Sequence, residues 1–130
     1  MDILRHLLPG HVIDHVHGIR WSGKSDLFLF KDAASRYDLL VTNNYRQLED
    51  PGETAQIKRS GLHHVSYRQR VKGLKGLALA CGAIIASMPG ILSDLMVADG
   101  QRIVLISELD PARRYRISDP RRDPPKYWPR

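Results

Sequence analysis

Polar residues that could bind a metal or a phosphate follow directly after a strand near the middle of the chain. Residues 38–42 read Asp-Leu-Leu-Val-Thr, the nearly continuous apolar pattern that is typical of a strand covered on both faces. Asn43 and Asn44 come next. Open α/β folds form their sites at the carboxyl ends of parallel strands, so these amides are expected to lie at such a site. Acidic residues there would indicate metal-dependent chemistry, whereas this strand ends in amides.

The elements around this strand alternate between helices and strands. Apolar spacing and turn signals predict helices at residues 1–8, 25–36, 51–60 and 71–97, the last one broken or bent at Pro89 and Gly90. Strands are predicted at residues 11–16, 37–42, 62–67 and 103–106, with a short edge strand at 115–117. This order predicts an α/β fold with a mostly parallel sheet between helical layers. A doubly wound sheet normally opens with a strand, so we expect one strand to be missing ahead of the first helix.

The helix at residues 51–60 has the clearest boundaries. Asp50 is a good capping residue, Pro51 takes the first helical position, and Glu53 sits where a capping box places its acid. Gly61 follows the last helical residue. These signals predict a helix that begins and ends sharply.

Length and composition indicate one globular domain with a distinct tail. The chain has 130 residues, of which 42% are hydrophobic and 26% charged. Five of its eight prolines fall in the last 20 residues. We therefore expect an α/β domain at residues 1–110 and a Pro/Arg-rich C-terminal tail at 111–130. The tail could bind RNA or a partner protein, or it could strap itself onto the domain.

Charge and cysteine content narrow the classes of function. The net charge of +6 favours a polyanionic partner, because basic surfaces attract phosphates. Six basic residues lie within positions 58–75, and this basic stretch is either a solvated surface or a contact for RNA backbone. The single cysteine, Cys81, excludes an intrachain disulfide and suits the cytoplasm. The longest apolar run, residues 77–88, is short for a membrane span, so no membrane contact is expected.

Several short motifs together resemble the PIN-like domains of VapC-type toxins. They are Leu-Leu-Pro-Gly-His at residues 7–11, His15-Val16, Gly23-x-x-Asp26, and Asp-Leu-Leu-Val-Thr-x-Asn at residues 38–44. The resemblance covers residues 3–118, and its motifs are moderately specific. It implies a three-layer α/β/α fold whose acidic side chains gather at one sheet edge, hold Mg²⁺ or Mn²⁺ and cleave RNA. A protein antitoxin is the partner that it implies, and a homodimer is a further expectation.

The resemblance also implies roles for individual residues. Asp26 would ligate the metal, Asp94 would supply a further acid, and Asn44 would occupy a third ligand position. By position alone, Thr42 at the strand end either satisfies backbone groups or touches substrate, and Arg46, which follows the asparagines, would contact phosphate. Each role has a plainer alternative: Asp26 suits a first helical turn, Asn44 suits a turn, and Asp94 suits a solvated helix face.

The chain departs from the family pattern at two points that bear on function. The family's first acid lies on an opening strand, which we expect to be missing here, so its role is assigned to no residue. The family has Thr-x-Asp where this chain has Thr-Asn-Asn at residues 42–44, so an amide replaces a carboxylate. Fewer carboxylates bind a hard divalent cation more weakly. The leading hypothesis is a metal-dependent endoribonuclease of the toxin–antitoxin type. The alternative is a catalytically impaired PIN-like module that binds RNA or protein.

Overall fold

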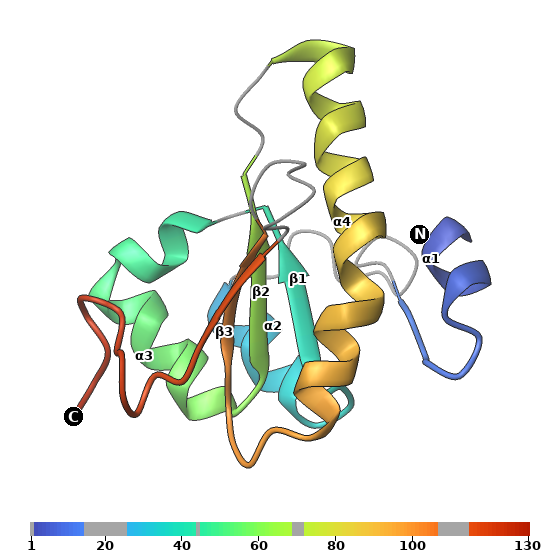
Figure 1. The fold of residues 1–130 in the computed structure, drawn as a ribbon. Helices are drawn as coiled ribbons and strands as arrows, with labels where there is room; N and C mark the ends of the chain where they lie inside the picture. Colours follow the sequence, from blue (N-terminus) through green and yellow to red (C-terminus); the bar gives the residue numbers. More distant parts are fainter. Residues whose placement is uncertain (1, 15–25, 44, 69–71, 107–114) are drawn as a thin grey trace.

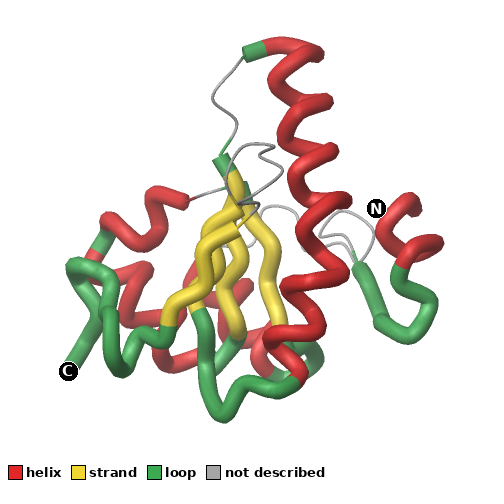
Figure 2. The backbone as a smooth tube through the Cα atoms, in the orientation of Figure 1, coloured by secondary structure: helices red, strands yellow, loops and turns green. Residues whose placement is uncertain are grey.

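The chain folds around a four-stranded, mostly parallel mixed sheet, seen in a computed structural model that describes residues 2–14, 26–43, 45–68, 72–106 and 115–130 (Figures 1 and 2). The helical elements are α1 (Asp2–Leu7), α2 (Asp26–Ala34), the 3-10 helix η1 (Tyr45–Glu49), α3 (Pro51–Ser60) and α4 (Gly73–Met96). The strands are β1 (Leu39–Thr42), β2 (His63–Tyr67), β3 (Ile103–Ile106) and β4 (Tyr115–Ser118), in that order across the sheet. The prediction of an α/β fold with a mostly parallel sheet is confirmed.

The register of the sheet decides which side chains share a face. β1, β2 and β3 run parallel, and β4 pairs antiparallel with β3. Leu40, His64 and Ile103 are register partners, so their side chains lie on one face. Val65 and Val104 are partners on the other face. The short edge strand predicted at residues 115–117 is present as β4.

Helices cover both faces of this sheet and create two hydrophobic clusters. On the face of Val65, buried residues of α4 such as Ile91 pack against β2 and β3, with Leu8 after α1 beside them. On the opposite face, Phe30 of α2 and Ile57 of α3 pack against β3. Burial of apolar area on both faces is what stabilises a parallel sheet.

The boundaries of α3 follow the capping signals of the sequence. The Asp50 side chain accepts a hydrogen bond from the Glu53 backbone N–H at 2.8 Å. Gly61 ends the helix with φ at 70°, a left-handed conformation that favours glycine. The sharp start and end predicted for this helix are confirmed.

Of the break or bend predicted for α4 at Pro89, the break is absent. The helix continues through this proline to Met96, although proline removes one backbone hydrogen bond. The next residue, Gly90, lies against the Tyr115 ring, where a Cβ atom would stand 3.3 Å from the Tyr115 hydroxyl. Packing against β3 and β4 therefore holds this stretch helical. By length and composition alone α4 could cross a membrane, with a mean hydropathy of 1.8 over its most apolar window, and 33% of that window is buried inside the fold.

The region before α2 also differs from its prediction. Residues 11–14 form no strand, and residues 15 and 16 of the predicted strand lie outside the described residues. Asp14 instead accepts a hydrogen bond from the Tyr37 hydroxyl, which ties this segment to the start of β1. Among the described residues, β1 forms one end of the sheet.

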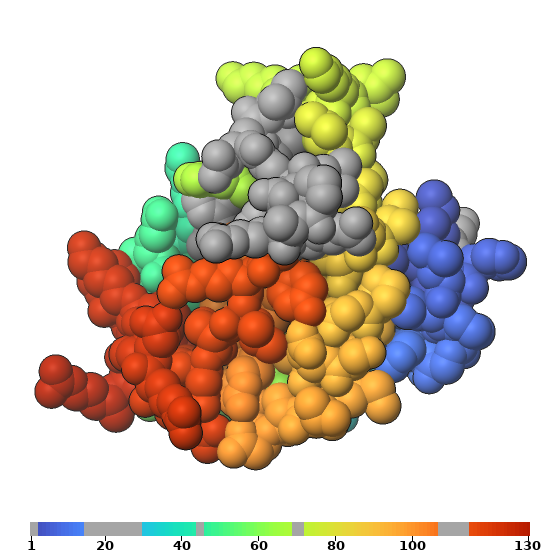
Figure 3. Space-filling model, viewed as in Figure 1, coloured from blue at the N-terminus to red at the C-terminus, as the bar shows by residue number. Residues whose placement is uncertain are grey.

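The end of the chain straps itself onto α3. Trp128 packs against the cluster of Phe30 and Ile57, and the Lys58 ammonium stands 6.0 Å from the centre of its ring system. Lys58 also donates a hydrogen bond to the Pro129 carbonyl. Figure 3 shows the tail (red) lying along the surface of the molecule. Of the alternatives for the tail, these contacts support the one in which it straps itself onto the domain.

Replacing Trp128 by Ala should lower the free energy of unfolding by about 1–3 kcal/mol, because a large aromatic group leaves an apolar cluster. Tyr127→Ala is the matched control, since Tyr127 is exposed and packs against neither cluster. It should change stability by less than about 0.5 kcal/mol. Urea unfolding followed by circular dichroism measures both variants, and equal losses would contradict the strap.

Candidate functional site

The carboxyl ends of the three parallel strands define the candidate site. β1 ends at Thr42, β2 at Tyr67 and β3 at Ile106, and parallel pairing brings these ends to one edge of the sheet. Thr42 is the register partner of Ser66, so both side chains lie on the face that α3 covers. After Thr42 the chain passes the exposed Asn43 and soon enters η1. We call this region the carboxyl edge.

Four exposed cationic residues lie on the segments that leave β1 and β2 and begin α4. Arg46 lies in η1 and Arg68 directly follows β2. Lys72 is the N-cap residue of α4 and Lys75 lies in its first turn. Figure 1 shows that α4 begins beyond the carboxyl ends of the strands. The segments that leave β1 and β2 therefore carry exposed positive charge.

Two carboxylates lie near Arg46 in sequence. Glu49 follows three residues after Arg46 in η1, so the two residues lie on the same side of this 3-10 helix. Asp50 follows it, and its side chain accepts the capping hydrogen bond of α3. The four cations named above outnumber these two carboxylates.

The predicted site residues fall in different parts of the structure. Thr42 and Arg46 both lie at the carboxyl edge, on either side of the strand-to-helix connection. Asn44 lies outside the described residues. Asp26 is the first residue of α2, and its side chain is also outside them.

Asp94 lies on α4 beside Tyr115, the register partner of Ile106 at the end of β3. It is exposed, and it accepts a hydrogen bond of 2.6 Å from the Tyr115 hydroxyl. That bond raises the pKa of Tyr115. α4 packs on the face of Val65, whereas α2, which begins at Asp26, packs on the opposite face. The two predicted metal ligands thus come from helices on opposite sides of the sheet.

The described side chains do not by themselves form the metal site that the resemblance implies, since the Asp26 side chain and Asn44 lie outside them. Among them, no three His, Cys, Asp or Glu side chains gather closely enough to hold a metal ion. A hard cation such as Mg²⁺ prefers several carboxylate oxygens. The Asp26 carboxylate is the remaining candidate, and no step of a metal mechanism is derived from the described side chains.

Beneath the carboxyl edge lies a group of buried polar residues that the sequence did not single out. We call Gln47, Thr54, His64 and Ser66 the buried polar bracket, and each of them is at most 3% exposed. His64 Nε2 lies 3.1 Å from Gln47 Oε1. The Thr54 hydroxyl donates to the Gln47 backbone carbonyl at 3.0 Å. The bracket thus joins β2, η1 and α3.

The His64 ring is neutral in this environment. Burial lowers its pKa to about 4. Because Gln47 Oε1 can only accept, the ring carries its single proton on Nε2 and donates it to Gln47. The other ring nitrogen, Nδ1, is then an acceptor.

Two atoms of the bracket have no hydrogen-bond partner among the described residues. They are His64 Nδ1 and Ser66 Oγ, and both are buried. Each such atom costs about 1–3 kcal/mol relative to a satisfied one. Apolar side chains at these positions would avoid that cost. The one signal in the sequence was the alternation of polar His64 and Ser66 in an otherwise buried strand.

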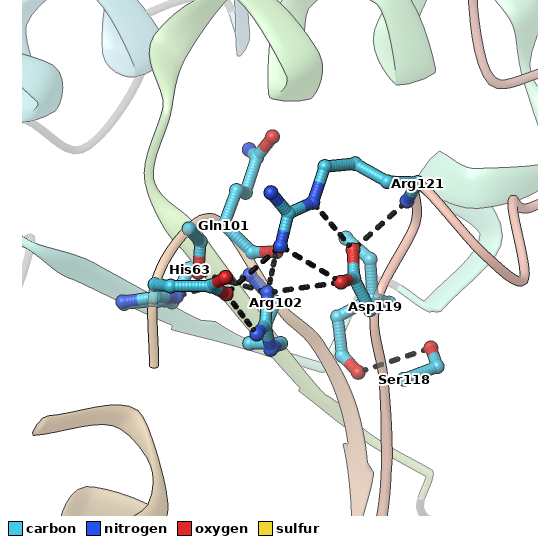
Figure 4. Close-up of polar contacts among 9 residues, drawn as sticks. His63, Gln101, Arg102, Ser118, Asp119 and Arg121 are labelled. Carbon is cyan, nitrogen blue, oxygen red and sulfur yellow. Dashed lines mark hydrogen bonds and ion pairs between the residues drawn. The ribbon is translucent and has the colours of Figure 1, made fainter. Parts of the chain in front are cut away.

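The opposite edge of the sheet carries a compensated charge cluster (Figure 4). Arg102 lies 2.7 Å from Asp99 and 3.6 Å from Asp119. Arg121 binds the same two carboxylates at 2.8 and 2.9 Å. Hydrogen bonds from Arg121 lower the pKa of Asp119 to about 2. Each cation is paired with carboxylates, so this cluster ties the start of β3 to the end of β4 and offers no unpaired charge to a ligand.

His63 lies at the same edge, and the hydrogen bond that its ring accepts depends on its protonation state. Its Nδ1 accepts a hydrogen bond of 3.0 Å from the Arg102 backbone N–H, which requires a neutral ring. Burial, and then the charge of Arg102, lower the pKa of His63. Protonation of this ring would break the bond between β2 and the segment before β3.

Stability should therefore fall between pH 7.5 and pH 5. The folded pKa values of His63 and His64 lie below the unfolded value, so the unfolded chain takes up protons first as the pH falls through 6.5. His64 alone should cost about 2 kcal/mol at pH 5, where the carboxylates of the cluster still stay ionised. Urea unfolding at the two pH values measures this loss. His63→Asn, which keeps an acceptor near the place of Nδ1, should show a smaller loss, and equal stability at both pH values would contradict the assignment.

No protein-family model, curated protein or solved structure matches this chain.

Proposed function

We propose that this protein is a PIN-like domain of the VapC toxin type whose carboxyl edge binds the phosphate backbone of RNA. The observation that carries this proposal is the group of exposed cations on the segments that leave β1 and β2 and begin α4, namely Arg46, Arg68, Lys72 and Lys75. The proposal includes the three-layer α/β/α arrangement of that family and a cytoplasmic location. The first candidate function is that of a catalytically impaired PIN-like module that binds RNA.

The chemistry of the edge suits a phosphodiester. Arginine presents a planar fork of donors to phosphate oxygens, and lysine adds a point charge. The Thr42 hydroxyl and the Asn43 amide add neutral donors beside these charges. The net charge of +6 favours the approach of a polyanion from a distance.

Metal-dependent cleavage of RNA is the second candidate. It is favoured by Asp26, which begins α2 and matches the family motif. Bound Mg²⁺ or Mn²⁺ would supply a hydroxide nucleophile and stabilise the charged intermediate. The described carboxylates form no metal site, so this candidate depends on Asp26, with Asn44 and Asp94 as the further residues of the proposed site.

A protein antitoxin is the partner that we propose alongside RNA. The first half of α4 exposes Leu74, Leu77 and Leu79, which offers such a partner an apolar surface between cationic residues. A homodimer stays a prediction, and no membrane contact is proposed.

Replacing Arg46 by Ala should weaken RNA binding by about 3- to 10-fold and lower the salt dependence by about one phosphate contact. Arg122→Ala is the matched control, because Arg122 is also exposed but lies in the tail beyond β4. Fluorescence anisotropy with a single-stranded RNA oligonucleotide, measured at several salt concentrations, gives both quantities. Equal effects of the two variants, or no RNA binding by the native chain, would rule out this site.

Cleavage is tested with the purified chain, RNA, and either Mn²⁺ or Mg²⁺. If the second candidate is correct, the native chain cleaves RNA and Asp26→Asn abolishes the activity, because the metal loses a charged ligand. Asn44→Asp should raise the activity by restoring a carboxylate. If none of the three proteins cleaves RNA and all have native circular dichroism spectra, the binding module is left as the function.

A further inference from the structure

Two neighbouring residues of helix η1 differ in their exposure to solvent. Arg46 is exposed, whereas the next residue, Gln47, is 3% exposed. Successive residues of a 3-10 helix point about 120° apart, so the burial of one fixes the direction of the other. Whatever holds Gln47 also decides where Arg46 is presented.

Gln47 is held from two elements. Its side-chain carbonyl lies 3.1 Å from His64 Nε2 of β2. Its backbone carbonyl accepts from the Thr54 hydroxyl of α3 at 3.0 Å and from the Asp50 N–H at 3.4 Å. η1 is thus tied both to the centre of the sheet and to the helix that follows it.

We infer that His64 is a positioning residue that acts through Gln47 to hold η1, and with it Arg46, at the carboxyl edge. This inference rests on the proposed RNA-binding function. His64 does not touch the substrate, because it is buried beneath η1. It acts on binding only by fixing the segment that carries the arginine.

Comparison with its register partners supports a role other than packing. Leu40 and Ile103 flank His64 on the same face of the sheet, and both are apolar. An apolar residue at position 64 would continue that pattern. His64 instead leaves its own Nδ1 without a partner among the described residues. What the imidazole adds over an aliphatic side chain is one directional hydrogen bond to η1.

A double-mutant cycle tests this inference. His64→Leu should weaken RNA binding by about 3- to 10-fold and lower the salt dependence as Arg46→Ala does, because the same phosphate contact is lost. Added to Arg46→Ala, it should cause no further loss. His64→Gln, which can place a donor near the position of Nε2, should bind RNA within about 2-fold of the native chain. Gln47→Leu removes the other end of the same hydrogen bond and should behave as His64→Leu does.

The outcomes separate this inference from the proposed function. If His64→Leu leaves RNA binding unchanged, or if its effect multiplies with that of Arg46→Ala, the positioning role is wrong although the function stands. If the native chain binds no RNA, the proposed function fails, and hydrogen exchange of the backbone amides of residues 45–49 decides the rest. Faster exchange in folded His64→Leu and Gln47→Leu, reversed in His64→Gln, would support positioning, and unchanged exchange would overturn it.

Discussion

The burial of β2 on both faces is the constraint on which the rest of the structure depends. Val65 faces α4 while His64 and Ser66 face α3, and all three are at most 1% exposed. A central parallel strand must satisfy its backbone through both neighbours, which aligns the ends of β1 and β3 with its own. The carboxyl edge exists because of that alignment. The polar face of β2 then reaches the segment that leaves β1 through the bond between His64 and Gln47.

Charged residues are arranged differently at the two edges of the sheet. At the amino ends, Arg102 and Arg121 share the carboxylates of Asp99 and Asp119. Asp99 and Arg121 are largely exposed, whereas the Arg102 and Asp119 side chains are only 15% and 17% exposed. The contribution of the cluster is mainly to connect β3 with β4. Near the carboxyl ends, Arg46, Arg68, Lys72 and Lys75 outnumber Glu49 and Asp50 among the described residues. A compensated cluster ties segments together, whereas an excess of one sign attracts a ligand of the other sign.

The sequence predicted the elements whose signals are local. The cap at Asp50, the helix end near Gly61 and the apolar strands predicted at 37–42 and 103–106 each depend on neighbouring residues, and the structure has each of them, the first strand beginning at Leu39. The continuity of α4 through Pro89 depended instead on packing against Tyr115 from a distant strand. The fold class was predictable because alternation of elements is a pattern along the chain.

The candidate site was predictable only in part, for the same reason. Thr42 and Arg46 follow a strand, so the sequence placed them at an edge. Gln47 and His64 are 17 residues apart, and no local rule brings them together. Single polar residues in buried elements were the available signal, and they acquire meaning only when the register of β1 and β2 is known.

The amide at position 44 changes the chemistry of the edge in a direction that matches its surroundings. A carboxylate there would repel phosphate unless a metal ion lay between them, whereas an asparagine is neutral and can donate to phosphate oxygens. The exposed Arg46, Arg68, Lys72 and Lys75 act in the same sense, because each attracts a phosphate directly. A metal site and a cationic site solve the same problem of binding a polyanion by different means. We propose that this chain uses the second, with the buried hydrogen bond from His64 giving Arg46 a defined position.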